Sequence, residues 1–267
     1  MSKKTLYLEC YSGISGDMTV AALLDLGADK EVLLKGLESL PVDGFEIKMG
    51  RVSKRGIDAF NFDVILKDGH HHHHHEKEQD HEHHHSYEHR NIEDIFNIID
   101  AGDLTEEAKK LSGKIFNIAA RAEAKAHGIE VEKVHFHEVG AIDSIVDIIA
   151  TAICLDNLEI EEVIVSELFE GNGYVKCQHG LMPVPVPAVV NILQESKLTV
   201  RLTENRGEMI TPTGAAIAAA IVTTRNLPES YTIEKVGIGA GKKDFKNANI
   251  LRAYLIERTP KNSFHRV

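Results

Sequence analysis

Apolar side chains recur along this chain with two different periods, which predict strands and helices in alternation. The longest helical pattern runs from Leu104 to His127, is rich in alanine and ends at Gly128. Residues 141–155 carry one apolar stripe at helical spacing and are also predicted as a helix. Shorter helices are expected over 17–27, 188–195 and 211–222, and strands over 5–10, 45–52, 57–66, 163–166, 173–177, 232–238 and 250–256. The strands at 45–52 and 57–66 are expected to form a hairpin.

This alternation predicts an α/β fold class, a mixed α/β (α+β) domain whose helices pack on a mixed sheet. A polar, histidine-rich stretch interrupts the pattern and is expected to be a disordered metal-binding loop. The expected organisation is an N-terminal lobe at 1–69, the loop at 70–90, a main lobe at 91–258 that forms one domain with the first lobe, and an unstructured tail at 259–267.

Composition narrows the class of protein. The chain has 267 residues, of which 43% are hydrophobic and 27% charged, as in ordinary globular proteins. A net charge of −11 argues against a general nucleic-acid binder, which needs a basic face. Three cysteines without framework spacing fit a reducing compartment, and neither a membrane-length apolar segment nor a signal peptide is recognisable. We therefore expect a cytoplasmic protein whose partners include neither nucleic acid nor membrane.

The histidine-rich stretch is the most distinctive chemical feature. Six consecutive histidines begin at His70, and five more follow by His89, mixed with acidic residues. Imidazole suits divalent nickel, zinc, copper and cobalt. An expression tag would sit at a terminus, whereas this run lies between two structured halves; a solvated polar loop without a role is the alternative. The candidate metal ligands are His70, His71, His72, His73, His74, His75, His81, His83, His84 and His85.

A second candidate site lies just before the helix at 141–155. In an extended segment His135 and His137 point to the same side, and Glu138 follows them. Two imidazoles and a carboxylate make a metal site with open positions, so His135, His137, Glu138 and the nearby Asp143 are candidate catalytic residues, with both histidines as metal ligands. Alternatively, the helix aspartates only cap or solvate the helix and His135 is a buried, hydrogen-bonded histidine.

Cys177 and His179 are also two residues apart and could present a thiolate and an imidazole together. This spacing suits a transient nickel or zinc site. The surrounding glycines and prolines could equally shape an ordinary turn at the end of a strand.

Three turns have the residues to hold an anion. Residues 12–17 lie between a strand and a helix, residues 211–214 open another helix, and the glycine-rich segment 237–244 carries lysines. None has P-loop spacing, but together they favour an anionic, nucleotide-like ligand. The candidate binding residues are Ser12, Gly13, Ser15, Gly16, Asp17, Thr211, Thr213, Gly214 and Lys242.

Five strings, in this order around the histidine-rich stretch, carry a family resemblance: LYLECYSGISGDM, VHFHEVGAIDSIVDI, GNGYVKCQHGLMPVPVPAV, GEMITPTGAA and GIGAGKKDF. Together they resemble the LarC-type nickel-insertion proteins, from Leu6 to about Glu257. The resemblance implies nickel insertion into a pyridinium bisthiocarboxylate mononucleotide, which yields the nickel-pincer cofactor of lactate racemase and related enzymes. It also implies a nickel chelatase of the lyase class that uses CTP with a divalent cation, Mn or Mg.

Full-length family members continue into a C-terminal domain tied to CTP use, whereas this chain stops soon after the last string. The chain therefore resembles the N-terminal half of the family. The resemblance then implies a C-terminal family domain, or a frameshifted partner that carries it, alongside the mononucleotide precursor. A second copy of the same chain, in a homo-oligomer, is a further candidate partner.

The sequence supports one leading hypothesis and two alternatives. In the leading one, the histidine-rich loop gathers nickel and passes it to His135, His137 and Glu138, and the substrate phosphate rests at one of the three turns. The chain could instead store or buffer nickel without catalysis. It could also be a metal-dependent hydrolase that activates water at the His135–Glu138 site.

Overall fold

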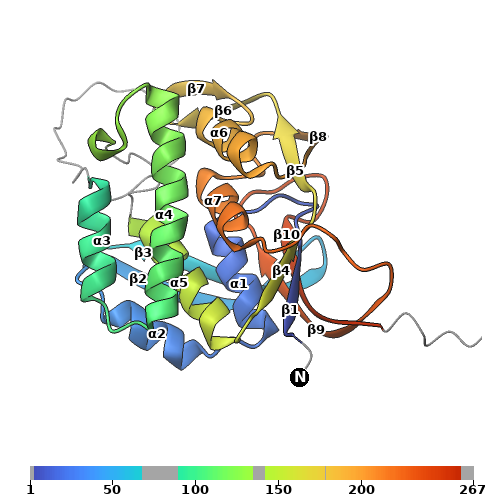
Figure 1. The fold of residues 1–267 in the computed structure, drawn as a ribbon. Coiled ribbons are helices and arrows are strands. Elements are labelled where there is room, and N and C mark those ends of the chain that lie inside the picture. The colour runs from blue at the N-terminus through green and yellow to red at the C-terminus, as the bar shows by residue number, and fades with distance from the viewer. Residues whose placement is uncertain (1–2, 68–89, 135–141, 178, 260–267) are drawn as a thin grey trace, which may run out of the picture.

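The computed structural model describes residues 3–67, 90–134, 142–177 and 179–259. Its centre is a six-stranded sheet in the order β2-β3-β9-β10-β1-β4 (Figure 1). The bounds of these strands are Thr5–Glu9 for β1, Phe45–Lys54 for β2, Ile57–Leu66 for β3, Glu162–Val165 for β4, Tyr231–Ala240 for β9 and Ile250–Arg258 for β10.

The sheet is mixed. β1 pairs with β10 antiparallel on one side and with β4 parallel on the other. The hairpin of β2 and β3 confirms the predicted pair, and β3 meets β9 in parallel. The predicted α/β class, with helices on a mixed sheet, is confirmed.

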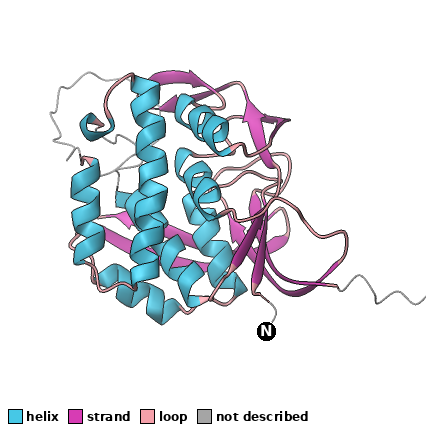
Figure 2. Cartoon of the chain, in the orientation of Figure 1, coloured by secondary structure: helices cyan, strands magenta, loops and turns pink. Residues whose placement is uncertain are grey.

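The helices, cyan in Figure 2, lie to one side of this sheet. They are α1 (Gly16–Leu26), α2 (Lys30–Glu38), α3 (Ile92–Ala101), α4 (Glu106–His127), the short 3-10 helix η1 (Val131–Lys133), α5 (Ile142–Asn157), α6 (Pro187–Ser196) and α7 (Pro212–Ile221). α1 and α5 pack directly on the strands of the sheet, and the others pack mainly on these two helices and on one another. On the opposite face of the sheet, Tyr7 stacks on Tyr254 in a small separate cluster.

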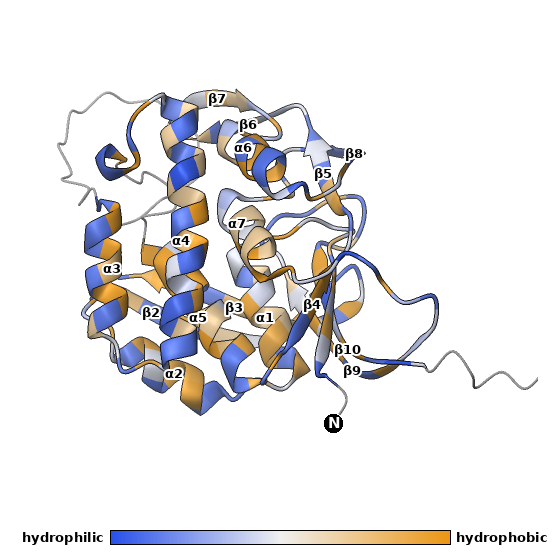
Figure 3. Cartoon of the chain, viewed as in Figure 1, coloured by the Kyte–Doolittle hydropathy of each residue, from blue (hydrophilic) through white to orange (hydrophobic). Residues whose placement is uncertain are grey.

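The main core lies between the helices and the sheet. Hydropathy alternates around α4, whose apolar side contributes the buried Ile115 and Phe116 (Figure 3). α1 approaches β9 closely because Gly239 has no side chain: a Cβ there would lie 2.1 Å from the carbonyl oxygen of Met18. α7 is buried along almost its whole length, which explains its continuous apolar sequence.

Two small sheets stand beside the main one. β5 (Leu168–Asn172) pairs in parallel with β8 (Val200–Arg206). β6 (Tyr174–Cys177) and β7 (Gly180–Pro183) form an antiparallel hairpin near the C-terminal end of α4 (Figure 1). This hairpin and the ends of the neighbouring helices position the candidate site.

Candidate functional site

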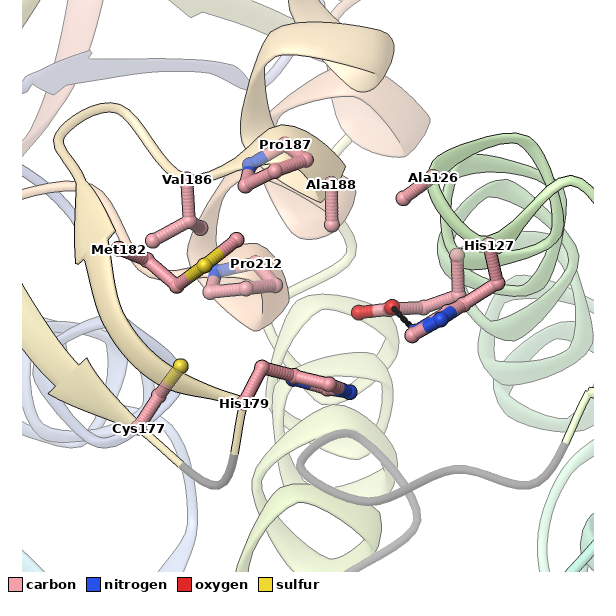
Figure 4. A pocket seen from close by; sticks show the side chains of 10 residues that line it. Ala126, His127, Cys177, His179, Met182, Val186, Pro187, Ala188 and Pro212 are labelled. Atoms are coloured by element: carbon pink, nitrogen blue, oxygen red, sulfur yellow. Dashed lines mark ion pairs between the residues drawn. The ribbon is translucent and has the colours of Figure 1, made fainter.

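A cavity of about 240 Å³ lies between the end of α4, the β6–β7 hairpin and the starts of α6 and α7 (Figure 4). Its lining combines apolar side chains with several metal-ligating types. The ligating residues among them are Glu123, His127, Cys177, His179 and Met182. Such a mixture of nitrogen, sulfur and oxygen donors suits a borderline metal such as nickel.

Two imidazoles meet at this cavity although they come from distant parts of the chain. The ring centroids of His127 and His179 are 4.9 Å apart. His127 occupies the last turn of α4, and His179 lies in the turn between β6 and β7. Figure 4 shows the two rings on neighbouring walls of the same pocket. Two rings at this separation could share one metal ion after small side-chain rotations.

Glu123 stands one helical turn before His127 on α4. Its Oε2 lies 3.6 Å from Nε2 of His127, and the Glu123 side chain is 16% exposed. In many metal sites a carboxylate beside a ligating imidazole orients the ring, and this ion pair has that arrangement at a distance longer than a hydrogen bond. The pair therefore has the form of a ligand with its supporting group.

The β6–β7 hairpin presents two sulfur atoms to the pocket. Cys177 and Met182 are partly buried on its inner side, whereas Tyr174 and Leu181 are exposed at 65% and 67%. The alternation follows from the strand period of two. The structure thus places the predicted Cys177 and His179 together on one cavity and adds His127, Glu123 and Met182, which we did not predict. Of these three residues, only Glu123 and His127 have a recognisable pattern in the sequence, their four-residue spacing on one helix face.

The described residues do not by themselves complete a metal centre. Among residues 3–67, 90–134, 142–177 and 179–259, no three histidine, cysteine, aspartate or glutamate side chains are grouped so that they could hold one ion. The predicted ligands and catalytic residues at 70–85, together with His135, His137 and Glu138, lie outside the described residues. Asp143 is described, in the first turn of α5.

Two of the predicted anion-binding turns adjoin each other. The amide of Ile14 donates a hydrogen bond to the Met209 carbonyl at 3.0 Å, and the amide of Thr211 donates to the Ile14 carbonyl at 3.1 Å. The turn at 12–16 leads into α1, and Thr211 caps α7 by accepting from the amide of Gly214. The sequence could not show that these turns form one surface.

The start of α5 joins the same junction. Thr213 Oγ1 donates to Ser144 Oγ at 3.3 Å, which connects the first turns of α7 and α5. Asp147 packs against the start of α1: a Cβ on Gly16 would lie 2.5 Å from Asp147 Oδ2. Three helix N-termini therefore converge, and each brings the positive end of its dipole.

Charged side chains surround this junction. Burial, followed by the neighbouring charges of Asp17 and Asp143, raises the pKa of Asp147 well above its usual value. Lys242 Nζ forms an ion pair with Asp63 Oδ1 at 2.7 Å. Burial opposes the charge of Lys242, but the hydrogen bond to Asp63 and the charges of Asp17 and Asp147 raise its pKa overall.

A buried glutamate supports the turn that precedes α7. Glu170 Oε1, on β5, accepts hydrogen bonds from the amides of Gly171, Met209 and Ile210 at 2.8, 2.6 and 3.2 Å. Burial raises the pKa of Glu170 to about 6, although the three amides act in the opposite direction. Pro212, in the first turn of α7, lines the cavity near His127. The helix junction and the cavity are therefore neighbours.

Comparison with known proteins identifies what the chain is similar to. A family model described as "Nickel insertion protein" matches residues 6–266. A protein of Alkaliphilus metalliredigens named "Pyridinium-3,5-bisthiocarboxylic acid mononucleotide nickel insertion protein" is 62% identical over 253 residues, 94% of this chain and 60% of the relative. A protein of Acetivibrio thermocellus with the same name is 44% identical over 258 residues, 94% of this chain and 60% of the relative.

A third relative, from Geobacter sp. strain M21, is named "Putative nickel insertion protein" and is 43% identical over 256 residues, 96% of this chain and 62% of the relative. The chain thus spans roughly three fifths of the length of these relatives, 60 to 62%. No solved structure matches it. None of the helices within the described residues has the length and apolar character needed to cross a membrane.

Proposed function

The chain belongs to the nickel insertion protein family, and from this membership we propose that it captures nickel and takes part in inserting it into a pyridinium-3,5-bisthiocarboxylic acid mononucleotide. The observation that carries the proposal is the pair of imidazoles, His127 and His179, 4.9 Å apart on the wall of one cavity. Imidazole is a suitable ligand for nickel.

An incomplete set of protein ligands suits a step in which the metal must leave. Two imidazoles would hold the ion while its remaining coordination positions receive the two thiocarboxylate sulfurs of the substrate. Cys177 and Met182 would offer sulfur donors during the exchange. If each new ligand bound before the last one departed, nickel would never become a bare ion.

Glu123 would act as the positioning residue for His127. Its carboxylate, 3.6 Å from Nε2, orients the ring and increases its basicity when the ring binds metal. In this proposal the apolar part of the lining, which includes Val186 and Ala188, receives the pyridinium ring and keeps water away from it.

The histidine-rich stretch at 70–85 would gather nickel from solution, because many interchangeable imidazoles bind and release an ion readily. His135, His137 and Glu138 remain proposed ligands or catalytic groups, since the segment that holds them connects η1 directly to α5. Asp143, at the start of α5, would adjoin that segment.

The activity would be that of a nickel chelatase of the lyase class in the cytoplasm, and the product would serve lactate racemase-type enzymes. CTP with Mn or Mg would act through the region of the longer relatives that this chain does not span. A nickel buffer and a metal-dependent hydrolase are the competing functions.

Titration calorimetry with Ni²⁺ tests the proposal. The full chain is compared with a chain that lacks residues 70–89 and with the same shortened chain carrying His127→Ala and His179→Ala. We expect the shortened chain to keep one tight nickel site and the double variant to lose it. If the shortened chain binds no nickel, the cavity is not a nickel site and a buffering role of the histidine-rich stretch replaces it. Turnover of phosphate or amide esters with zinc or manganese would favour the hydrolase.

A further inference from the structure

The junction of α1, α5 and α7 combines groups that attract anions with groups that attract cations. The helix N-termini and Lys242 favour a phosphate, whereas Asp17 and Asp147 would repel one. Both requirements are met when a divalent cation lies between the carboxylates and the phosphate. Magnesium is bound in this way in many enzymes, through one or two carboxylates and the phosphate of the substrate.

Asp147 supplies the observation that points to a ligand. Within the described part of the chain, its Oδ1 atom is buried and has no hydrogen-bond partner. Its carboxylate lies against Gly16, which could not carry a side chain without striking it. A buried carboxylate oxygen without a partner is costly to keep, and the charges of Asp17, Asp143 and Asp63 add repulsion, so a positive ion at this point would stabilise the ionised form of Asp147.

Lys242 does not remove this need. Its ammonium group is paired with Asp63 at 2.7 Å. It acts on Asp147 only as a neighbouring charge, and its effect is smaller than the effects of burial and of Asp17 and Asp143. The lysine is instead placed to meet an anion that arrives from solvent.

We propose that Asp17 and Asp147 bind a divalent cation of the magnesium class, Mg²⁺ or Mn²⁺, which together with Lys242 and the N-terminus of α7 holds the phosphate monoester of a mononucleotide. The identification of the phosphate with that of the nickel-accepting substrate rests on the proposed function; the cation–phosphate site does not. Pro212 lines the cavity and opens α7, so a mononucleotide held there would direct its ring toward His127 and His179.

A cation site that the phosphate completes is consistent with the finding that no three ligating side chains are grouped among the described residues. Two carboxylates, Asp17 and Asp147, are too few to hold the ion without the phosphate. Asp17 Oδ1 already accepts hydrogen bonds from the amide of Met18, at 2.8 Å, and from the hydroxyl of Ser15. These bonds fix the orientation of the carboxylate at the start of α1.

The test uses Mn²⁺ as the cation and ribose 5-phosphate as the phosphate monoester, with electron paramagnetic resonance of free Mn²⁺ as the measurement. We expect ribose 5-phosphate, but not ribose, to tighten Mn²⁺ binding about ten-fold, and Asp147→Asn or Asp17→Asn to weaken it about ten-fold. Lys242→Ala should keep Mn²⁺ binding and lose the gain from phosphate. Asp103→Asn, the same change at an exposed position, serves as the control.

Thermal unfolding supplies a second measurement that separates binding from folding. Mn²⁺ with ribose 5-phosphate should raise the melting temperature of the wild type and of Asp103→Asn but leave that of Asp147→Asn unchanged. Equal Mn²⁺ affinity in the wild type and both aspartate variants would overturn the proposal. It would also be overturned if ribose tightened Mn²⁺ binding as much as ribose 5-phosphate does. Because no nickel is present, these results are independent of whether the cavity binds nickel.

Discussion

The imidazole rings of His127 and His179 lie 4.9 Å apart, centroid to centroid, although one belongs to the end of α4 and the other to the turn of the β6–β7 hairpin. If both rings ligate one nickel ion, their contributions depend on each other. Once either ring is removed, the other has lost its partner, so the second substitution should cost much less than the first.

A double-mutant cycle checks this coupling. His127→Ala and His179→Ala should each weaken nickel binding by about ten-fold or more in a chain without residues 70–89. The loss of affinity in the double variant should be much smaller than the product of the two single losses. His265→Ala, in the C-terminal segment, is the matched control. Fully multiplicative losses would mean that the two histidines bind separate ions.

Acid should release nickel from the cavity. Ligating imidazoles must be neutral, and free histidine becomes protonated near pH ~6.5, so protons compete with the metal. The expected result is a steep loss of nickel affinity between pH 7.5 and pH 5 on titration calorimetry of the chain without residues 70–89. A flat affinity over this range would contradict histidine ligation.

Much of the fold could be predicted because hydrophobic periodicity was strong where burial is one-sided. The helix at 104–127 and the β2–β3 hairpin were expected nearly as they occur. α2 and α3 were not expected: they are short, and their caps, Asp29 and Asn91, are local polar signals in regions without a long apolar stripe. Of the four strands in the two-stranded sheets, only β6 was expected, at 173–177; β5, β7 and β8 were missed, and strands in such sheets have little core to pattern them.

The candidate site was predictable only in part. Motif strings identified Cys177 and His179, since two ligand types at strand spacing are visible in one segment. His127 and Glu123 show only the four-residue spacing of one helix face, because their relation to the hairpin arises from tertiary packing of α4 against the region around α6 and α7. Asp147 could not be singled out from the sequence either, because its chemistry depends on its tertiary contact with Gly16.

The contact between Gly16 and Asp147 predicts a local packing limit. Gly16→Ala would place a Cβ 2.5 Å from Asp147 Oδ2 and 2.6 Å from its Cβ, so either α1 or α5 must move. We expect a loss of about 1–3 kcal/mol in the free energy of unfolding, measured by denaturant titration. Gly50→Ala is the control, because nothing lies within 4 Å of the new atom, and it should change stability by less than about 1 kcal/mol. Equal effects would show that α1 and α5 are not in firm contact there.

Glu170 should make the stability of the fold depend on pH. Its pKa is raised from 4.5 to about 6, so the folded chain keeps a proton that the unfolded chain releases between these values. The contribution of Glu170 to the free energy of unfolding is therefore fully present below pH ~4.5 and is lost as the pH rises through about 6. A shift of this size corresponds to about 2 kcal/mol, because one pKa unit equals about 1.4 kcal/mol.

The variant Glu170→Gln isolates this dependence. Its amide oxygen can still accept from the amides of Met209 and Ile210, and it does not titrate. Chemical unfolding of both proteins at pH 4.5 and pH 7.5 should show the wild type losing about 2 kcal/mol relative to the variant as the pH rises. Other groups that titrate in this range affect both proteins equally, so the difference reports Glu170 alone. A difference that does not change with pH would mean that Glu170 is as readily ionised in the fold as in the unfolded chain, and that the turn before α7 is open to water.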